Sequence, residues 1–410
     1  MTIPEPAGRL DDGYLGAATK VMRVLVVVGT RPEAIKLAPI IRKLYAEPWA
    51  ETKVLLTGQH TDLVVPLVAD FGISVDEHLQ VMTPNQTLAT LVSRLLEGID
   101  GMLEKLRPSL VIAQGDTASV LASSLASFLR KIPFAHVEAG LRTGDIKSPF
   151  PEELNRVLTS RMTSWHFAPT IKAKENLLRE GVSEAKVWVT GNTVIDTLKQ
   201  TLREGRIVDG YNYSCGSSET NTEEWCQILN DQRPFILITA HRRENFGAPL
   251  GRICEAILAL ARHYADYDFV YPVHPNPEVR GTVYKMLSQQ RNVRLMPPAD
   301  YRTFCFLMQN AKLILSDSGG VQEEAPALGV PVLVLRDDTE RPEAVEIGAN
   351  RLVGTKPEQI IASVHELLNF SDAYARMATA GSPYGDGHAA DAIVRILSCL
   401  LGIKNEAFTG

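Results

Sequence analysis

Residues that could bind an anion and transfer protons follow apolar segments at several points of this chain. The stretch "SDSGGVQEEAPALGVPVLV" (316–334) continues an apolar run with two glycines and then two glutamates. A Ser-Gly-Gly turn at the start of a helix presents unpaired backbone N–H groups and the positive end of the helix dipole, which favour phosphate. A turn in which Ser318 only caps a helix would look the same. Other residues of the chain are therefore needed to distinguish a phosphate-binding turn from a turn with only a structural role.

The first half of the chain places cations and carboxylates in similar positions. The segment "GTRPEAIK" follows the first apolar run and sets Arg31 and Lys36 at the start of a helix. The planar fork of an arginine and the point charge of a lysine both suit phosphate. "GDT" sets Asp116 after a second run, and "EAGLRTGD" sets Glu138 after a third. A helix cap at Asp116 or a solvated basic first turn is the structural alternative.

Further candidates lie on a helix and after the apolar runs of the second half. In "PEELNR", Glu152 and Arg156 are four residues apart and share a helix face, as a surface ion pair also would. "TAHRRENFG" and "YPVHPNP" set His241 and His274 after two apolar runs, and "DDTERPEAVEIG" sets Arg341 in a loop. A lone histidine is more often a packing or surface residue than a catalytic one.

Together these residues combine two kinds of chemistry. Cations and glycine amides suit a diphosphate, and carboxylates with a histidine suit proton transfer beside it. The pattern therefore indicates an enzyme that acts on a nucleotide-activated compound. No GxGxxG follows the first apolar run, and the five cysteines show no CxxC or Cys/His zinc spacing. We accordingly expect no dinucleotide, no metal and no other cofactor.

Short β-branched runs alternate with helix-length segments, which is typical of βαβ units around a buried parallel sheet. The helical patterns include 34–46 and 119–130. The expected strands are 23–28, 53–57, 110–114, 133–137 and 186–190 in the first half, and 235–239, 268–273, 292–296, 312–316, 330–335 and 350–354 in the second. A polar stretch at about 201–234 divides the halves. Because ligands bind beyond the carboxyl ends of parallel strands, we expect the site in a cleft between two domains.

Composition narrows the choice of partners and location. The 410 residues exceed one ordinary core, so two domains are expected. A net charge of −6 gives no support for a nucleic-acid or anionic-membrane partner. Residues 1–20 hold no signal-peptide core, and no apolar run approaches the length of a membrane span. Scattered cysteines suit reduced thiols, so we expect a cytoplasmic protein.

Nine motifs carry a family resemblance over about residues 21–387. They are "GTRPEAIKLAP", "GDT", "HVEAGLRTGD", "PEELNR", "GNTVIDTL", "HRRENFG", "YPVHPNP", "DSGGVQEEAP" and "TERPEAVEIG". In this order they resemble the non-hydrolysing UDP-N-acetylglucosamine 2-epimerases. The resemblance implies reversible conversion of UDP-N-acetylglucosamine to UDP-N-acetylmannosamine, for polysaccharide biosynthesis, without NAD or metal. Loss of UDP would give 2-acetamidoglucal, and UDP would then add back.

The resemblance also implies an architecture. It predicts an α/β fold of two Rossmann-like parallel-sheet domains that face a central cleft, as in glycosyltransferase-B folds, in a homodimer. The expected parts are an N-terminal extension (1–20), an N-terminal domain (21–195), a UDP-binding C-terminal domain (196–385) and a C-terminal helix (386–410) that packs back on the first domain.

Roles for individual residues follow from the matching motifs. The implied acid/base residues are Asp116, Glu138 and Glu152, and His241 would assist at the diphosphate. The implied substrate-binding residues are Arg31, Lys36, Arg156, Ser318, Gly319, Gly320, Glu324 and Arg341, with Glu324 on the ribose hydroxyls and Arg341 on the sugar. A second, activating UDP-N-acetylglucosamine site would use Gln59, His60, Gln86 and His274, and there Asp62 and Asn85 depart from the family pattern. Because the proton at carbon 2 is not next to a carbonyl, the reaction needs strong stabilisation of the leaving group, which the cations supply.

Three alternatives stay open. A UDP-sugar glycosyltransferase shares this fold and a similar Gly-Gly-x-x-Glu ribose site, but it would need an acceptor. A 2-epimerase of a modified UDP-N-acetylhexosamine would carry the same motifs. A nucleotide-sugar sensor would bind without turnover, although the retained carboxylates argue against it.

Overall fold

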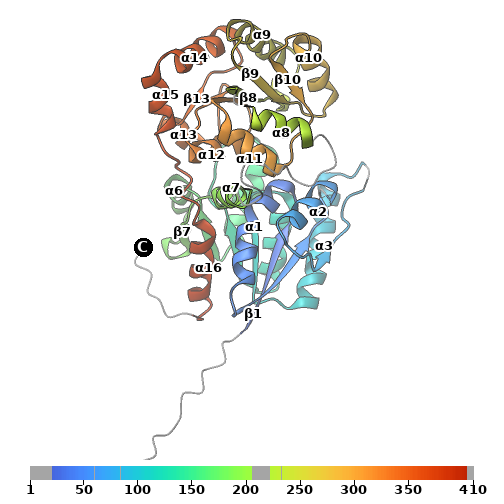
Figure 1. Cartoon of the computed structure of the whole chain (residues 1–410). Coiled ribbons are helices and arrows are strands. Elements are labelled where there is room, and N and C mark those ends of the chain that lie inside the picture. Colours follow the sequence, from blue (N-terminus) through green and yellow to red (C-terminus); the bar gives the residue numbers. More distant parts are fainter. Residues whose placement is uncertain (1–20, 60, 84, 206–221, 232, 404–410) are drawn as a thin grey trace, which may run out of the picture.

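The structure is a computed structural model, and it describes residues 21–59, 61–83, 85–205, 222–231 and 233–403. The expected N-terminal extension, His60 and much of the polar stretch between the two halves lie outside these residues. The described chain forms two lobes, one built on each of two parallel sheets, and Figure 1 shows them stacked one above the other.

The first lobe contains a sheet of seven described parallel strands in the order β3-β2-β1-β4-β5-β6-β7. These strands are β1 (Met22–Val28), β2 (Ala50–Leu56), β3 (Glu77–His78), β4 (Leu110–Gln114), β5 (Phe134–Val137), β6 (Trp165–Ala168) and β7 (Val187–Val189). The order reverses between β1 and β4, which is the point where open parallel sheets usually bind ligands.

The second lobe contains a sheet of six described parallel strands in the order β10-β9-β8-β11-β12-β13. These strands are β8 (Phe235–Thr239), β9 (Asp268–Pro272), β10 (Val293–Met296), β11 (Leu313–Ser316), β12 (Val332–Val334) and β13 (Asn350–Leu352). Here the order reverses between β8 and β11. Both sheets thus follow one winding scheme, and the predicted fold class, two Rossmann-like sheets in a glycosyltransferase-B-like arrangement, is confirmed.

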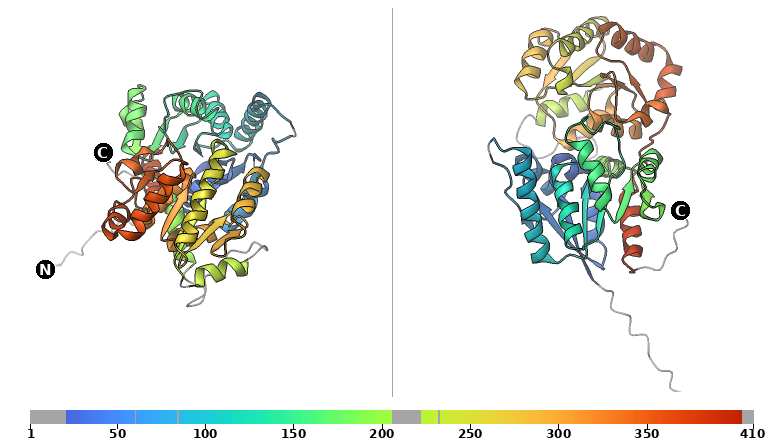
Figure 2. Two further views of the ribbon diagram at one scale, coloured as in Figure 1. Left: turned by 90° about the horizontal axis from the view of Figure 1, so that it is seen from above. Right: turned by 180° about the vertical axis from the view of Figure 1, so that it is seen from behind.

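Helices connect and cover the strands in both lobes, as Figure 2 shows from above and from behind. Those of the first half are α1 (Arg31–Tyr45), α2 (Thr61–Asp70), α3 (Leu88–Leu106), α4 (Ala118–Leu129), α5 (Glu152–Met162), α6 (Ile171–Arg179), the 3₁₀ turn η1 (Glu184–Lys186) and α7 (Thr193–Glu204). Those of the second half are α8 (Thr222–Asn230), η2 (Arg243–Asn245), α9 (Ala248–His263), α10 (Pro277–Leu287), α11 (Tyr301–Asn310), α12 (Gly319–Glu324), η3 (Ala325–Leu328), α13 (Pro342–Glu346), α14 (Pro357–Asn369), α15 (Ser371–Ala378) and α16 (Ala389–Leu400).

The central strand β1 shows why the first sheet lies between two helical layers. Its side chains alternate between the two faces, so Val24 and Val26 pack into one core with α1, α2 and α16. Leu25 and Val27 pack into a separate core with α3 and α4. All four side chains are buried, which explains why this strand is a continuous apolar run instead of an alternating one.

The two lobes share part of one hydrophobic core. Leu198 and Leu202 of α7 belong to the same buried cluster as Phe306 of α11, and this cluster continues to β1 of the first sheet. A Cβ on Gly205 would lie 2.2 Å from the ring of Phe306, so the chain passes α11 too closely for a side chain. The relative position of the lobes is therefore fixed by packing as well as by chain connection.

The last described helix, α16, packs on the first lobe against α1 and α7 (Figure 1). Its first turn is held by the Asp196 carboxylate, which accepts hydrogen bonds from the backbone N–H groups of Ala389 at 3.2 Å and Ala390 at 2.8 Å. The expected domain boundary after residue 195 falls inside α7, which contacts helices of both lobes.

The sequence analysis missed two strands of the first sheet, β3 and β6. Strand β3 has only two residues and is partly exposed, and β6 ("WHFA") begins with a tryptophan and a histidine instead of β-branched residues. Neither segment carries the apolar pattern by which the other strands were recognised. Within the described residues, no helix combines the length and apolarity that crossing a membrane requires.

Candidate active site

The glycine turn after β1 packs tightly against its surroundings. A Cβ on Gly29 would lie 2.6 Å from Ser119 Oγ and 2.9 Å from both Gln59 Oε1 and Glu33 Oε2, so a larger residue would have to displace these side chains. Glu33 closes the turn: Oε2 accepts hydrogen bonds from the N–H groups of Gly29 at 2.5 Å and Thr30 at 3.1 Å. This is the capping box of α1.

Glu33 also ties this turn to the one after β4. Its Oε1 accepts a hydrogen bond at 2.6 Å from the hydroxyl of Thr117, the residue after Asp116. Burial raises the pKa of Glu33 to about 7, against the opposing effect of these hydrogen bonds. The sequence analysis did not select Glu33, although its place three residues after Thr30 is the capping-box signature.

Glu138 follows β5 in a left-handed backbone conformation, with φ of 62°. This conformation is uncommon outside glycine and concentrates at functional sites. The carboxylate forms an ion pair with Lys36 and accepts a hydrogen bond from Asn192 Nδ2 at 2.9 Å. Burial raises the pKa of Glu138, Lys36 opposes the rise, and the neighbouring Glu323 adds to it.

Lys36 also crosses from the first lobe to the second. Its Nζ lies 3.1 Å from Glu323 Oε2 on α12, and Glu323 Oε1 accepts a hydrogen bond from Arg341 Nε at 2.6 Å. Arg341 in turn pairs with Glu340 at 2.5 Å. The result is a row of alternating charges that begins at Glu138, and it shows that the carboxyl ends of the two sheets face each other.

Asp116 follows β4 and is held by α5. Its Oδ2 accepts from Arg156 Nε at 2.9 Å and lies 2.6 Å from Arg156 Nη2. The opposite side of the guanidinium contacts Glu153 at 2.8 Å, and Asn155 Nδ2 donates to the Asp116 carbonyl at 2.8 Å. The structure thus brings Arg156 together with Asp116 and Glu153, whereas the sequence had suggested Glu152 as its partner on the helix.

The candidate residues do not all contact one another. Glu152 is the first residue of α5 and is partly buried. Among the described residues, no hydrogen bond or ion pair joins Glu152 to Asp116 or Glu138. Arg31 is the first residue of α1 and is likewise partly buried, next to the glycine turn.

In the second lobe, a buried aspartate joins the loops after β8 and β11. The Asp317 carboxylate accepts from the backbone N–H groups of His241 and Arg242, both at 2.9 Å, and from Asn245 Nδ2 at 3.0 Å. These three bonds place His241 beside the turn that begins at Ser318. Sequence reasoning treated Asp317 only as part of the "DSGG" motif, because a side chain that binds a distant loop leaves no local signal.

The Ser-Gly-Gly turn supports a neighbouring cation. Ser318 is the N-cap residue of α12, as the structural interpretation predicted, and its side chain makes no capping hydrogen bond. A Cβ on Gly319 would lie 2.5 Å from Arg341 Nη1, so the missing side chain lets the guanidinium lie against the turn. A Cβ on Gly320 would lie 3.4 Å from Glu324 Oε1, an ordinary contact.

Glu324, expected at the ribose, is buried behind this turn. Its Oε2 accepts a hydrogen bond at 2.9 Å from the hydroxyl of Tyr301 at the start of α11. Burial raises the pKa of Glu324 to about 8, against the effect of that hydrogen bond. The side chain therefore carries less than a full charge near neutral pH in this state.

The residues expected at a second site have different surroundings. Gln59 Oε1 accepts from Ser119 Oγ at 2.5 Å, next to Gly29. Gln86 accepts from the Thr83 backbone at 3.2 Å. His274 is exposed, with its ring 5.2 Å from that of His241, while His60 lies outside the described residues. Gln59 and His274 thus border the candidate active site from opposite lobes.

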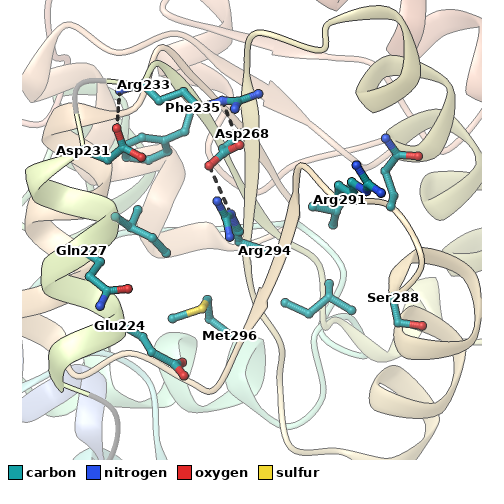
Figure 3. Close-up of a pocket in the computed structure, with 14 residues that line it drawn as sticks. Glu224, Gln227, Asp231, Arg233, Phe235, Asp268, Ser288, Arg291, Arg294 and Met296 are labelled. Carbon is teal, nitrogen blue, oxygen red and sulfur yellow. Dashed lines mark hydrogen bonds and ion pairs between the residues drawn. The ribbon is translucent and has the colours of Figure 1, made fainter.

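A separate pocket of about 480 Å³ lies at the amino ends of β8, β9 and β10. Figure 3 shows Arg294 pointing to Asp268 within it, and Asp268 also pairs with Arg233 at 3.0 Å. None of the sequence-predicted site residues lines this pocket. The structure contains no group of three or more His, Cys, Asp or Glu side chains suited to a metal ion, within the part of the chain that it describes.

The arrangement has the components for two tasks. Cations from both lobes converge beside the Ser318–Gly320 turn, which suits a diphosphate. Two carboxylates, the nearly buried Glu138 and the half-buried Asp116, are each held by a cation at the edge of the first sheet that faces this turn, and they suit proton transfer.

Comparison with known proteins identifies relatives that share this arrangement. Residues 42–398 match the family model for UDP-N-acetylglucosamine 2-epimerase. A UDP-N-acetylglucosamine 2-epimerase of Escherichia coli O157:H7 is 45% identical over 379 residues, which cover 92% of this chain and 98% of the relative.

Two solved structures have the same fold. The UDP-GlcNAc 2-epimerase of Neisseria meningitidis bound to UDP-GlcNAc matches with a TM-score of 0.83 and 45% identity, over 92% of this chain and 99% of the other. The enzyme of Methanocaldococcus jannaschii in complex with UDP-GlcNAc and UDP matches with a TM-score of 0.75 and 37% identity, over 92% and 100%.

Proposed function

This chain belongs to the UDP-N-acetylglucosamine 2-epimerase family, and on that basis we propose that it interconverts UDP-N-acetylglucosamine and UDP-N-acetylmannosamine. The observation that carries the proposal is the Glu138–Lys36–Glu323–Arg341 row, in which a basic carboxylate lies beside cations from both lobes. Inversion at carbon 2 with departure of UDP requires a carboxylate that accepts the proton and cations that stabilise the leaving diphosphate.

The proposed reaction is an elimination followed by an addition. A carboxylate takes the proton from carbon 2, and the electron pair of that C–H bond forms a double bond between carbons 1 and 2. The bond from carbon 1 to the diphosphate oxygen breaks, and its electron pair leaves with UDP. In the return step UDP bonds to carbon 1 again, and carbon 2 receives a proton on its opposite face. UDP and 2-acetamidoglucal are the balanced intermediates.

The leaving group needs the cations. We propose that Arg31 and Lys36 stabilise the charge that develops on the diphosphate, with the amides of Ser318, Gly319 and Gly320 and with His241 as further donors, while Arg341 contacts the sugar. Glu324 would accept the ribose hydroxyls. No step of this scheme needs a metal or NAD.

The proton transfers need groups on both faces of the sugar ring. One fixed side chain does not reach both faces, so we propose that at least two of Asp116, Glu138 and Glu152 take part. Arg156 would serve the substrate through Asp116, which it contacts. Asp116→Asn, Glu138→Gln and Glu152→Gln should each be made, and a variant in the proton path should lose turnover about 100-fold or more. Near-normal turnover in all three would leave His241 as the main candidate.

The decisive experiment is incubation with UDP-N-acetylglucosamine alone in deuterated water, followed by NMR. We expect UDP-N-acetylmannosamine to form and both sugars to gain deuterium at carbon 2. Epimerisation without solvent label would refute the proton-transfer mechanism. No turnover of any UDP-N-acetylhexosamine would refute the function.

This experiment also separates the alternatives. A glycosyltransferase would not exchange the carbon-2 proton without an acceptor, and a sensor would bind without turnover. A panel of UDP-N-acetylhexosamines that carry a carboxylate or other amides would identify a modified substrate by its higher kcat/KM.

Several properties of the assembly remain proposals on the same basis. We propose a homodimer, to be measured by light scattering, and domains at 21–195 and 196–385 with residues 386–410 returning to the first. Residues Gln59, His60, Gln86 and His274 would form the activating site, and added UDP-N-acetylglucosamine should then raise the rate of the reverse reaction. A cytoplasmic location agrees with Cys254, Cys305 and Cys399, which are free thiols.

A further inference from the structure

Lys36 is shared between two carboxylates that come from different lobes. Glu138 contacts it from the edge of the first sheet, and Glu323 lies 3.1 Å away on α12 of the second lobe. All three side chains are nearly buried, with 9%, 8% and 2% exposure for Lys36, Glu138 and Glu323. A single ammonium charge therefore stabilises two anions in a setting with little water.

Glu323 is the most buried of these groups, and it has a second cation. Arg341 Nε donates to its other oxygen at 2.6 Å, while Gly319 leaves room for the guanidinium. Although burial opposes ionisation, Arg341 and Lys36 lower the pKa of Glu323. Glu323 is thus a fixed negative charge between two of the cations that the proposed function assigns to the diphosphate and sugar.

We propose that Glu323 is a positioning residue that divides the charge of Lys36 between itself and Glu138, and so keeps Glu138 basic enough to move the carbon-2 proton. The inference rests on the proposed function for the identity of the reaction. It gives a role to the first glutamate of "QEEAP", for which the diphosphate and ribose contacts leave none.

The physical argument concerns the groups that face Glu138. These are Lys36 of α1, Asn192 before α7, Glu323 of α12 and Arg341 before α13. Two of them, Lys36 and Arg341, are cations. Without Glu323 to offset their charge, they would lower the pKa of Glu138 and make it a poor base. Glu323 offsets one of those charges, and its own negative charge disfavours a second anion beside it.

Glu323→Gln tests this arrangement, since it keeps the shape and removes the charge. The acid limb of the kcat/KM pH profile reports the free enzyme's base, and it should move to lower pH by about 0.5–2 units. kcat/KM at its optimum should fall about threefold to tenfold because the base is weaker. Affinity for UDP should stay equal or rise, because Lys36 and Arg341 then carry more uncompensated charge. A purely structural role would lower activity and UDP affinity together and leave the limb in place.

Glu340→Gln is the matched control. Glu340 also contacts Arg341, at 2.5 Å, but its other cations are Arg242 and Arg336 instead of Lys36. The acid limb of the kcat/KM pH profile of Glu340→Gln should stay within about 0.2 pH unit of that of the parent protein. An equal shift in both variants, or an unmoved limb in Glu323→Gln, would overturn the proposal.

Two further measurements keep the test decisive. Glu323→Asp keeps the charge but withdraws it from Lys36, so it should shift the limb in the same direction and by less. If Glu323→Gln does not fold, Glu323→Asp serves as the test variant. An acid limb that does not move in Glu323→Asp would then count against the proposal. NMR titration of glutamate carboxyl carbons, with Glu138 assigned by its loss in Glu138→Gln, follows the same shift without turnover. Absence of turnover in the parent protein refutes the proposed function alone, while this titration still decides the role of Glu323.

Discussion

Glu324 provides a prediction that links UDP affinity to pH. The carboxyl is buried against Tyr301, and its pKa of about 8 in this state means that about nine in ten molecules hold it neutral at pH 7. Two ribose hydroxyls are better bound by an ionised carboxylate than by a neutral acid. UDP should therefore bind with loss of a proton, and its affinity should fall as the pH drops below 8.

The magnitude follows from the pKa. Each pH unit below 8 adds about 1.4 kcal/mol to the free energy needed to ionise Glu324, so its contribution to UDP affinity should weaken about tenfold per unit down to pH 6. Binding of UDP should lower the pKa of Glu324, because the ribose hydroxyls favour the ionised carboxylate. The contribution of Glu324 to UDP affinity is therefore complete above pH 8 and is lost as the pH falls toward the lower pKa of the complex.

The assay is calorimetric titration with UDP from pH 6 to pH 9 for the parent protein and Glu324→Gln. The terminal phosphate of UDP also takes up a proton near pH 6. That effect is common to both proteins and cancels in the ratio of their affinities. We expect a parent advantage of about 100-fold at pH 9 that shrinks to little or none at pH 6. A ratio that does not change with pH would refute the reasoning and return Glu324 to a structural role.

Further predictions concern support, stability and cofactors. Tyr301→Phe removes a donor from the buried Glu324 carboxylate and should weaken UDP binding about fivefold to tenfold at pH 8, measured by calorimetry, whereas unchanged affinity would show that Tyr301 does not position it. Gly319→Ala would place a methyl group 2.5 Å from Arg341 Nη1, so it should displace the guanidinium and lower kcat/KM at least about tenfold, and parent-like kinetics would contradict the close contact. Burial lowers the pKa of His136 to about 4, so below pH 6.5 the unfolded state binds more protons than the folded state. The free energy of unfolding, measured with urea, should therefore fall by about 3 kcal/mol between pH 6.5 and pH 4 because of this residue. In His136→Gln the free energy of unfolding should depend less on pH over the same range. Activity should survive EDTA without added NAD, and recovery of lost activity by a divalent ion would show that the diphosphate site had been misread.

The sequence predicted the architecture well, because continuous apolar strands and helix-length spacers leave a local signal. It also predicted which residues end the strands, since Asp116, Glu138, His241 and Ser318 each follow an apolar run. Strands β3 and β6 were missed because a two-residue strand and a strand that opens with "WH" lack that signal.

Pairings between distant residues were the part that sequence could not supply. The i, i+4 rule suggested Glu152 as the partner of Arg156, whereas the guanidinium contacts Glu153 one turn back and Asp116 forty residues earlier in the chain. Glu323 was not among the site residues predicted from the sequence, because its two cations come from another lobe and from a later loop. Such contacts depend on how the lobes meet, and no spacing along the chain records that.

The return of α16 to the first lobe has a consequence for how the protein is made. The face of α1 that α16 covers is complete only when both residue 45 and residue 389 have been synthesised. At translation rates of about 5–20 residues per second, a nascent chain carries this uncovered apolar face for roughly 10–40 s after α7 leaves the ribosome. The first lobe is therefore the last to be finished, and a stop codon before α16 would damage the half of the protein that was translated first.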